Sequence, residues 1–203
     1  MTVSVFRADF SELVQELVSI HPPIANRFAA PATEAQISTL ESWLGTAIPV
    51  EAREIYASCN GQLDQPVIGG VLDRTLLSVE QAIDELSVHD EIRRSGITQF
   101  AVPEDERTTE NFPSASHVPI LSDGTGNFIG YDVRPSALGR FGQVLVFGAD
   151  VDTRVVFESI PELWGELVNA LRAGNWTIVE DDLTGLSEIH FKTLTETLKT
   201  LWA

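Results

Sequence analysis

Residues 117–133 read HVPILSDGTGNFIGYDV, a stretch in which two runs of mostly apolar residues flank the polar, glycine-rich segment SDGTGN. Glycine-rich segments of this kind occur in phosphate-binding loops, in calcium-binding loops and in tight turns between strands. These three structures require different residues after the glycines, so the surrounding sequence distinguishes between them.

A phosphate-binding loop lies between a strand and a helix, whose first N–H groups hold the anion. Here residues 128–135 read FIGYDVRP, which predicts a second strand, and the G-x-G spacing is too short for a P-loop. An EF-hand calcium loop that began at Asp123 would need glycine at its sixth position and glutamate at its twelfth. Those positions hold Phe128 and Arg134. The stretch is therefore predicted to be a β-hairpin with a tight turn.

The segments after this hairpin continue the sheet. Residues 143–147 (QVLVF) and residues 154–159 (RVVFES) are apolar runs that predict a second pair of strands, joined by the segment GADVDT. Before the hairpin, residues 67–77 predict short strands, and residues 88–116 predict a long polar connection.

Helical patterns lie on both sides of these strands in the sequence. Apolar spacing, caps and terminal glycine or proline residues predict helices at residues 9–20, 33–45, 49–61, 78–86 and 159–174. Three capping boxes are predicted, at Thr33 and Gln36, Ser78 and Gln81, and Ser159 and Glu162. After the segment NWTIVEDD, apolar spacing predicts an amphipathic helix over residues 186–202. The predicted fold class is α+β, with a mostly antiparallel sheet packed against helices.

The composition limits the classes of partner. Thirty acidic and thirteen basic residues give a formal net charge of −17, which repels phosphate backbones and anionic membranes. We therefore expect no nucleic-acid partner and no membrane partner, whereas a basic protein would be attracted. Acidity that serves only solubility is the alternative explanation. The single cysteine, the lack of a signal-peptide pattern and the lack of a long apolar run favour a cytoplasmic location.

No catalytic or metal-binding pattern is present in the sequence. The histidines His21, His89, His117 and His190 have no ligand spacing, and Cys59 belongs to the buried stripe of a predicted helix. No G-x-S-x-G, HExxH or CxxC motif occurs. We expect no enzymatic activity, no cofactor and no metal, and an enzyme remains only a remote alternative.

The order of these segments resembles the SUKH superfamily, the SMI/KNR-type domain. The resemblance rests on ATEAQISTLESWLGTAIPVEAREIYASCNG, LLSVEQAID, VPILSDGTGNFIGYDV, GQVLVFG and VVFESIPELWGEL. It covers residues 33–171 of one predicted domain, residues 1–203, and leaves residues 1–30 as an N-terminal helix and residues 174–203 as a C-terminal helical extension. One departure is His117, which lies where the family often has tryptophan before the proline-isoleucine pair.

This resemblance implies a non-enzymatic protein-binding domain with two possible roles. Bacterial members are mostly immunity proteins, which bind and neutralise toxins, many of them nucleases or deaminases. A fungal relative is a scaffold in cell-wall synthesis and has long disordered tails. The sequence shows no such tails, so an immunity protein with a basic toxin domain as its partner is the first hypothesis. A scaffold or regulator of cell-wall or glucan synthesis is the alternative.

Polar residues beside the predicted strands and loops are the candidate partner-binding residues. They are Asp73, Glu104, Asp105, Glu106, Asp123, Asn127, Asp132 and Glu158. The resemblance implies a polar or acidic residue at Asp132 and at Glu158. Each has a structural alternative, since Asp132 could brace the hairpin, Glu158 could simply precede a helix cap, and Asp123 could form the turn.

Overall fold

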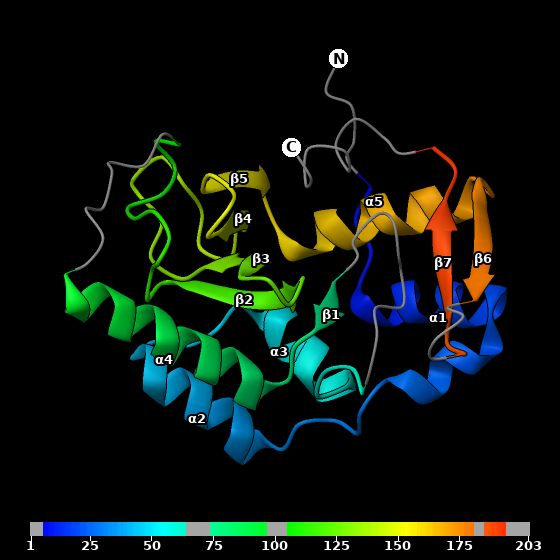
Figure 1. The fold of residues 1–203 in the computed structure, drawn as a ribbon, viewed down its shortest axis with the longest axis horizontal. Coiled ribbons are helices and arrows are strands. Elements are labelled where there is room, and N and C mark those ends of the chain that lie inside the picture. The colour runs from blue at the N-terminus through cyan, green and yellow to red at the C-terminus, as the bar shows by residue number, and fades with distance from the viewer. Residues whose placement is uncertain (1–5, 64–73, 97–104, 181–184, 194–203) are drawn as a thin grey trace.

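The computed structural model describes residues 6–63, 74–96, 105–180 and 185–193. It contains one five-stranded antiparallel sheet, one two-stranded sheet and the helices that cover them (Figure 1). The predicted α+β architecture with a mostly antiparallel sheet is confirmed. Among the described residues, no helix is both long enough and apolar enough to cross a membrane.

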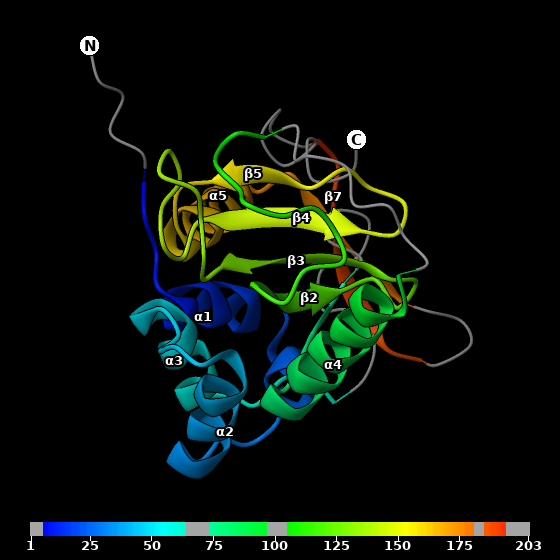
Figure 2. The same ribbon diagram turned by 90° about the vertical axis from the view of Figure 1, so that its left-hand side faces the viewer.

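The five-stranded sheet has the strand order β1-β2-β3-β4-β5, which follows the sequence, and Figure 2 shows β2 to β5 in this order. Its strands are β1 (Thr75–Leu76), β2 (His117–Ser122), β3 (Asn127–Asp132), β4 (Val144–Gly148) and β5 (Arg154–Phe157). The hairpin β2–β3 and the pair β4–β5 confirm the sequence-based prediction. Of the short strands predicted over residues 67–77, the described residues contain only β1.

The helices begin and end largely where the sequence signals them. They are α1 (Phe10–Ile20), the 3-10 helix η1 (Pro22–Arg27), α2 (Glu34–Leu44), α3 (Val50–Ser58), α4 (Val79–Ser95) and α5 (Ile160–Arg172). Thr33 and Ser78 form the predicted capping boxes of α2 and α4, and Gly45 ends α2 in the left-handed conformation.

Three predictions are wrong at the level of single elements. Helix α4 continues to Ser95 rather than ending near residue 86, so the connection after it is shorter than predicted. Ser159 makes no side-chain cap, and the Glu162 carboxylate accepts hydrogen bonds from Arg7 Nη2 (2.8 Å) and from the backbone N–H of Glu158 (3.1 Å) rather than from the Ser159 backbone.

The third correction concerns the C-terminal segment. Residues 187–191 do not form the start of a helix but form β7 (Ser187–Phe191), which pairs antiparallel with β6 (Trp176–Glu180). Ile189 of β7 is fully buried against the main core, and Arg27 Nη1 donates to the Ser187 carbonyl at 2.9 Å. Pairing and burial therefore outweigh the helical spacing of the sequence. Residues 194–202 of the predicted helix lie outside the described residues.

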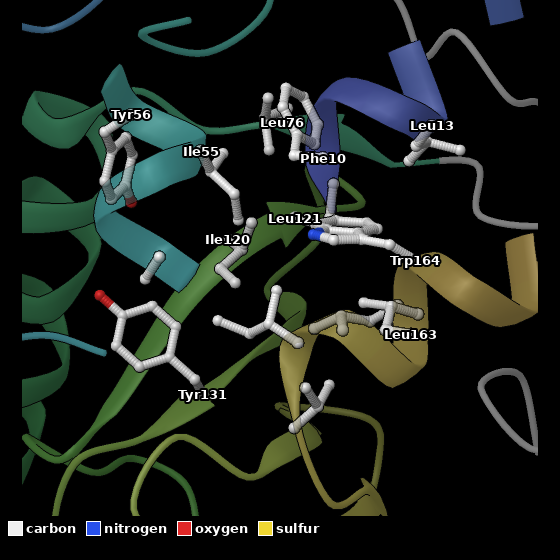
Figure 3. Close-up of a cluster of buried hydrophobic side chains, with 14 of the residues drawn as sticks. Phe10, Leu13, Ile55, Tyr56, Leu76, Ile120, Leu121, Tyr131, Leu163 and Trp164 are labelled. Atoms are coloured by element: carbon white, nitrogen blue, oxygen red, sulfur yellow. The ribbon is translucent and has the colours of Figure 1, made fainter. Parts of the chain in front are cut away.

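The sheet is buried on both faces. One face packs against α1, α3 and α5, and Figure 3 shows side chains such as Ile55, Ile120 and Leu163 meeting there. The opposite face carries a smaller cluster of Phe128, Leu145, Phe147 and Val155, with Phe112 packed against it. This double covering explains why β2, β3 and β4 are buried along their whole length, and it leaves the strand ends and edges as the places where the sheet meets solvent.

Candidate protein-binding surface

The predicted residues Asp105, Glu106 and Glu158 lie together at the outer edge of β5, around Arg107. Asp105 accepts hydrogen bonds from Arg107 Nε (2.9 Å) and Nη2 (2.7 Å), and from the backbone N–H of Val155 (2.9 Å). Arg107 Nη2 in turn donates to the Val155 carbonyl at 3.0 Å. The two side chains thus occupy both outward backbone groups of Val155, as a neighbouring strand would.

This arrangement fixes the charge state of Asp105. The hydrogen bonds from the Arg107 guanidinium, aided by those from the Val155 and Arg107 backbone, lower the pKa of the Asp105 carboxyl to about 2. Asp105 is therefore ionised and engaged within the fold.

Glu158 is held more loosely. Its side chain is 48% exposed, and its carboxylate oxygens lie 3.5 Å from Arg107 Nη1 and 3.6 Å from Arg140 Nε. Exposed pairs at these distances contribute little to stability, so Glu158 is available to a partner at small cost to the fold.

A surface cavity of about 530 Å³ opens beside the Asp105–Arg107 pair. It is lined by Asp105, Glu106, Arg107, Leu138, Asp152, Thr153 and Arg154. Within the described part of the chain, the side-chain carboxylates of Glu106 and Asp152 are exposed and make no ion pair. Leu138 is 68% exposed at the same cavity. We define these three residues, Glu106, Leu138 and Asp152, as the cavity rim.

Leu138 and Asp152 were not predicted from the sequence as binding residues. Asp152 lies in the connection GADVDT and Leu138 in the loop between β3 and β4, and neither segment carries a local binding signal. Their proximity to Glu106 results from the long-range contact of residues 105–108 with β5 and with the 134–143 loop, in which Ser136 Oγ donates to the Glu106 carbonyl.

Asp132 lies inside the protein, next to this surface but not on it. Its side chain is fully buried, accepts hydrogen bonds from the Arg134 backbone N–H (2.8 Å) and Gln143 Nε2 (3.1 Å), and has its pKa raised to about 6 by burial. Gln143 Nε2 also donates to the Arg107 carbonyl at 3.0 Å. Asp132 therefore braces the loops behind the cavity, and its direct contact with a partner stays a prediction.

Asp123 and Asn127 lie at the other end of β3, in the predicted turn. The Asp123 carboxylate accepts from the backbone N–H groups of Thr125 (2.8 Å) and Asn127 (3.1 Å), while Asn127 Oδ1 accepts from the Asp150 backbone N–H (2.9 Å). These bonds hold the two hairpin turns of β2–β3 and β4–β5 together. The structure thus separates the candidate residues into two groups, and Asp73 and Glu104 lie outside the described residues.

Cys59, His89 and His117 are buried, whereas His21 and His190 are half-buried. Burial raises the pKa of the Cys59 thiol to about 11, so it carries almost no thiolate at neutral pH. Burial lowers the pKa of His117 to about 4. In the described ranges, no group of three or more histidine, cysteine, aspartate or glutamate side chains is placed to hold a metal ion.

Comparison with known proteins gives the family. The sequence model of the SMI1 / KNR4 family (SUKH-1) matches residues 31–166, about two thirds of the chain. The chain belongs to this family. The match confirms the resemblance seen in the sequence and spans α2 to the first half of α5, so α1 and the β6–β7 hairpin lie outside it.

Curated relatives of this SMI1 / KNR4 family member are fungal. The "Cell wall assembly regulator SMI1" of Saccharomyces cerevisiae is 39% identical over 82 residues, which are 37% of this chain and 16% of the relative. The "Cell wall biosynthesis/cell cycle regulator smi1" of Schizosaccharomyces pombe is 28% identical over 167 residues, 74% of this chain and 33% of the relative. The "Glucan synthesis regulatory protein" of Neurospora crassa is 34% identical over 65 residues, 32% of this chain and 12% of the relative. The chain thus spans a third or less of the length of these relatives.

Proposed function

We propose that this chain is a non-catalytic protein-binding domain that acts in the regulation of cell-wall or glucan synthesis. Its relatives are named as regulators of these processes rather than as enzymes. Those names favour the alternative drawn from the sequence over the first hypothesis, a toxin-neutralising immunity protein, which none of these relatives' names supports.

The cavity rim is the observation that carries the binding role. Glu106 and Asp152, whose carboxylates form no ion pair with another described residue, lie beside an exposed leucine at a cavity large enough for a side chain. A lysine or arginine side chain could place its charged end near the carboxylates and its methylene groups on Leu138. The net charge of −17 would speed the encounter with such a basic partner.

The partner and the role of charge can be tested together. We expect the tagged full chain to retain proteins of cell-wall synthesis from its own cells at low salt and to lose most of them at high salt, because exposed charge pairs are screened. Mass spectrometry of the retained proteins identifies the partners. A single stoichiometric partner with a toxin domain would instead contradict the regulatory role and support the immunity function.

A further inference from the structure

The β6–β7 hairpin lies outside the part of the chain that the family model matches, and α5 separates it from β5 (Figure 1). Its inner strand β7 is anchored by the buried Ile189 and by the bond from Arg27 to Ser187. Strand β6 pairs with β7 alone among the described strands, so its outer edge is the end of a sheet.

The backbone register shows which groups lie on that edge. Lys192 N–H donates to the Asn175 carbonyl at 2.7 Å, which makes these two residues a hydrogen-bonded pair. Hydrogen-bonded and non-hydrogen-bonded pairs alternate in an antiparallel ladder, so Thr177 and Val179 bond to β7. The N–H and C=O groups of Ile178 and Glu180 therefore point away from β7, and no described residue bonds to them.

The side chains of β6 do not protect this edge. Ile178 and Val179 are each 43% exposed. Ile178 is exposed even though it lies on the same face of the hairpin as its cross-strand partner Ile189, which is buried. Natural edge strands are usually blocked by lysine, proline, a bulge or a covering segment. Strand β6 has the sequence WTIVE and pairs with β7 without a bulge, so it contains no lysine, no proline and no bulge. Strand β5 differs, because Asp105 and Arg107 bond to the outward backbone groups of Val155.

The charge beside this edge indicates what would cover it. Glu180 is exposed at the end of β6 and has no ion-pair partner among the described residues. A second copy of this chain carries the same net charge of −17 and would be repelled. A segment with lysine or arginine near Glu180 would be attracted.

We propose that the β6 edge binds an extended segment of a partner protein as an added strand, with β-branched residues beside Ile178 and basic residues beside Glu180. Main-chain hydrogen bonds to Ile178 supply affinity, and the side chains supply preference, as in other cases of strand addition. This inference rests on the proposed protein-binding function but uses a surface separate from the cavity rim.

A synthetic peptide tests this surface directly. The probe is the blocked heptapeptide Lys-Thr-Val-Thr-Val-Thr-Lys, labelled for fluorescence anisotropy and titrated with the full-length protein. We expect binding that is weakened about tenfold or more by Ile178→Pro, because proline removes the outward N–H and leaves the bonds to β7 in place. Circular dichroism shows whether the variant folds.

Four further measurements use the wild-type protein or a control variant. In the first, the peptide is N-methylated at the alternate amides that face β6. In the second, both peptide lysines are replaced by glutamate. Each change should weaken binding about tenfold or more. The Asp84→Asn/Glu91→Gln variant, which removes two charges from the exposed face of α4, should bind the probe like wild type. Loss of probe binding in the Glu106→Gln/Asp152→Asn variant would show that the probe occupies the cavity rim and not β6.

Several results would overturn the proposal. They are an absence of probe binding up to about 1 mM, equal affinity for the N-methylated peptide, and unchanged affinity in a folded Ile178→Pro variant. A wild-type dimer in sedimentation velocity that Ile178→Pro dissociates would show that a second copy occupies the edge instead.

Discussion

Gly130→Ala is expected to lose about 3 kcal/mol or more of its free energy of unfolding, a large part of the stability of an ordinary domain. Gly130 lies in the middle of β3, and a Cβ atom there would lie 2.0 Å from the Val118 carbonyl oxygen and 2.9 Å from the Pro119 Cα. Both atoms belong to the backbone of β2, which the β2–β3 ladder holds in place. The clash can therefore be relieved only by moving two strands apart. Urea unfolding followed by tryptophan fluorescence measures the loss.

Gly124→Ala is the matched control in the same hairpin. Gly124 has φ of +76°, but no heavy atom lies within 4 Å of a Cβ at that position. Only the left-handed conformation opposes the alanine, so we expect a loss of about 1–2 kcal/mol. If Gly130→Ala were no less stable than Gly124→Ala, the close approach of β2 and β3 described above would be wrong.

Acid should destabilise the protein through two buried histidines. Burial lowers the pKa of both His89 and His117 to about 4, from about 6.5. Glu110 raises the pKa of His117, but Arg93 and His89 lower it. The folded state keeps the histidines neutral, whereas the unfolded chain protonates them below about pH 6.5. Their neutral form therefore costs no stability above pH 6.5, and stability is lost as the pH falls from 6.5 to 4. We expect each histidine to lower the free energy of unfolding by about 2–3 kcal/mol at pH 4.5 relative to neutral pH.

The double variant His89→Phe/His117→Phe isolates this effect. Phenylalanine retains the aromatic contacts that His89 makes with Phe112 and Phe128, and that His117 makes with Phe147. We expect its stability, measured by urea unfolding from pH 7 to pH 4.5, to fall much less than that of wild type. An equally steep fall would show that other groups cause the acid sensitivity.

Titration of Asp132 stabilises the protein as the pH falls, which opposes the effect of the histidines, so the measurement needs a control for Asp132. Its pKa is raised to about 6 by burial, so the ionised form costs stability above that pH. This cost disappears as pH falls from 6 towards 3.8, which offsets part of the loss from the histidines. Comparing the histidine variants in an Asp132→Asn background removes that compensation.

Local signals predicted most of the fold. The capping boxes at Thr33 and Ser78, the stop at Gly45 and the turn around Asp123 depend on residues close in sequence, and the structure has them. Two of the three predictions that failed, the Ser159 cap and the C-terminal helix, depend on distant residues. Glu162 bonds to Arg7, 155 positions away, rather than capping with Ser159.

The same distinction applies to the surface. The acidic character near Asp105 and Glu106 is visible in the sequence, but the pairing of Asp105 with Arg107 and Val155 is not, because β5 lies about fifty positions further along the chain. The pairing gives Asp105 a structural role, and its contact with a partner stays a prediction. The cavity rim likewise joins three loops that are distant in sequence, so its composition could be found only in three dimensions.

The two surfaces suit different parts of a partner. The cavity rim at β5 is proposed to bind a single basic side chain and the β6 edge an extended segment, and α5 separates the two (Figure 1). A regulator that holds one partner at each surface, or one long partner across both, could use both. Simultaneous engagement would raise the overall affinity without new contacts.

The most direct test of the proposed function is the affinity of the partner recovered from cells for two double variants, measured by isothermal titration calorimetry at low salt. Glu106→Arg/Asp152→Arg reverses the charge at the cavity rim, and Asp84→Arg/Glu91→Arg makes the same charge change on the exposed face of α4. We predict that the rim variant binds about tenfold or more weakly than the α4 variant, because only the rim charges contact the partner. Equal affinities of the two variants would contradict the assignment of the cavity rim as the binding surface.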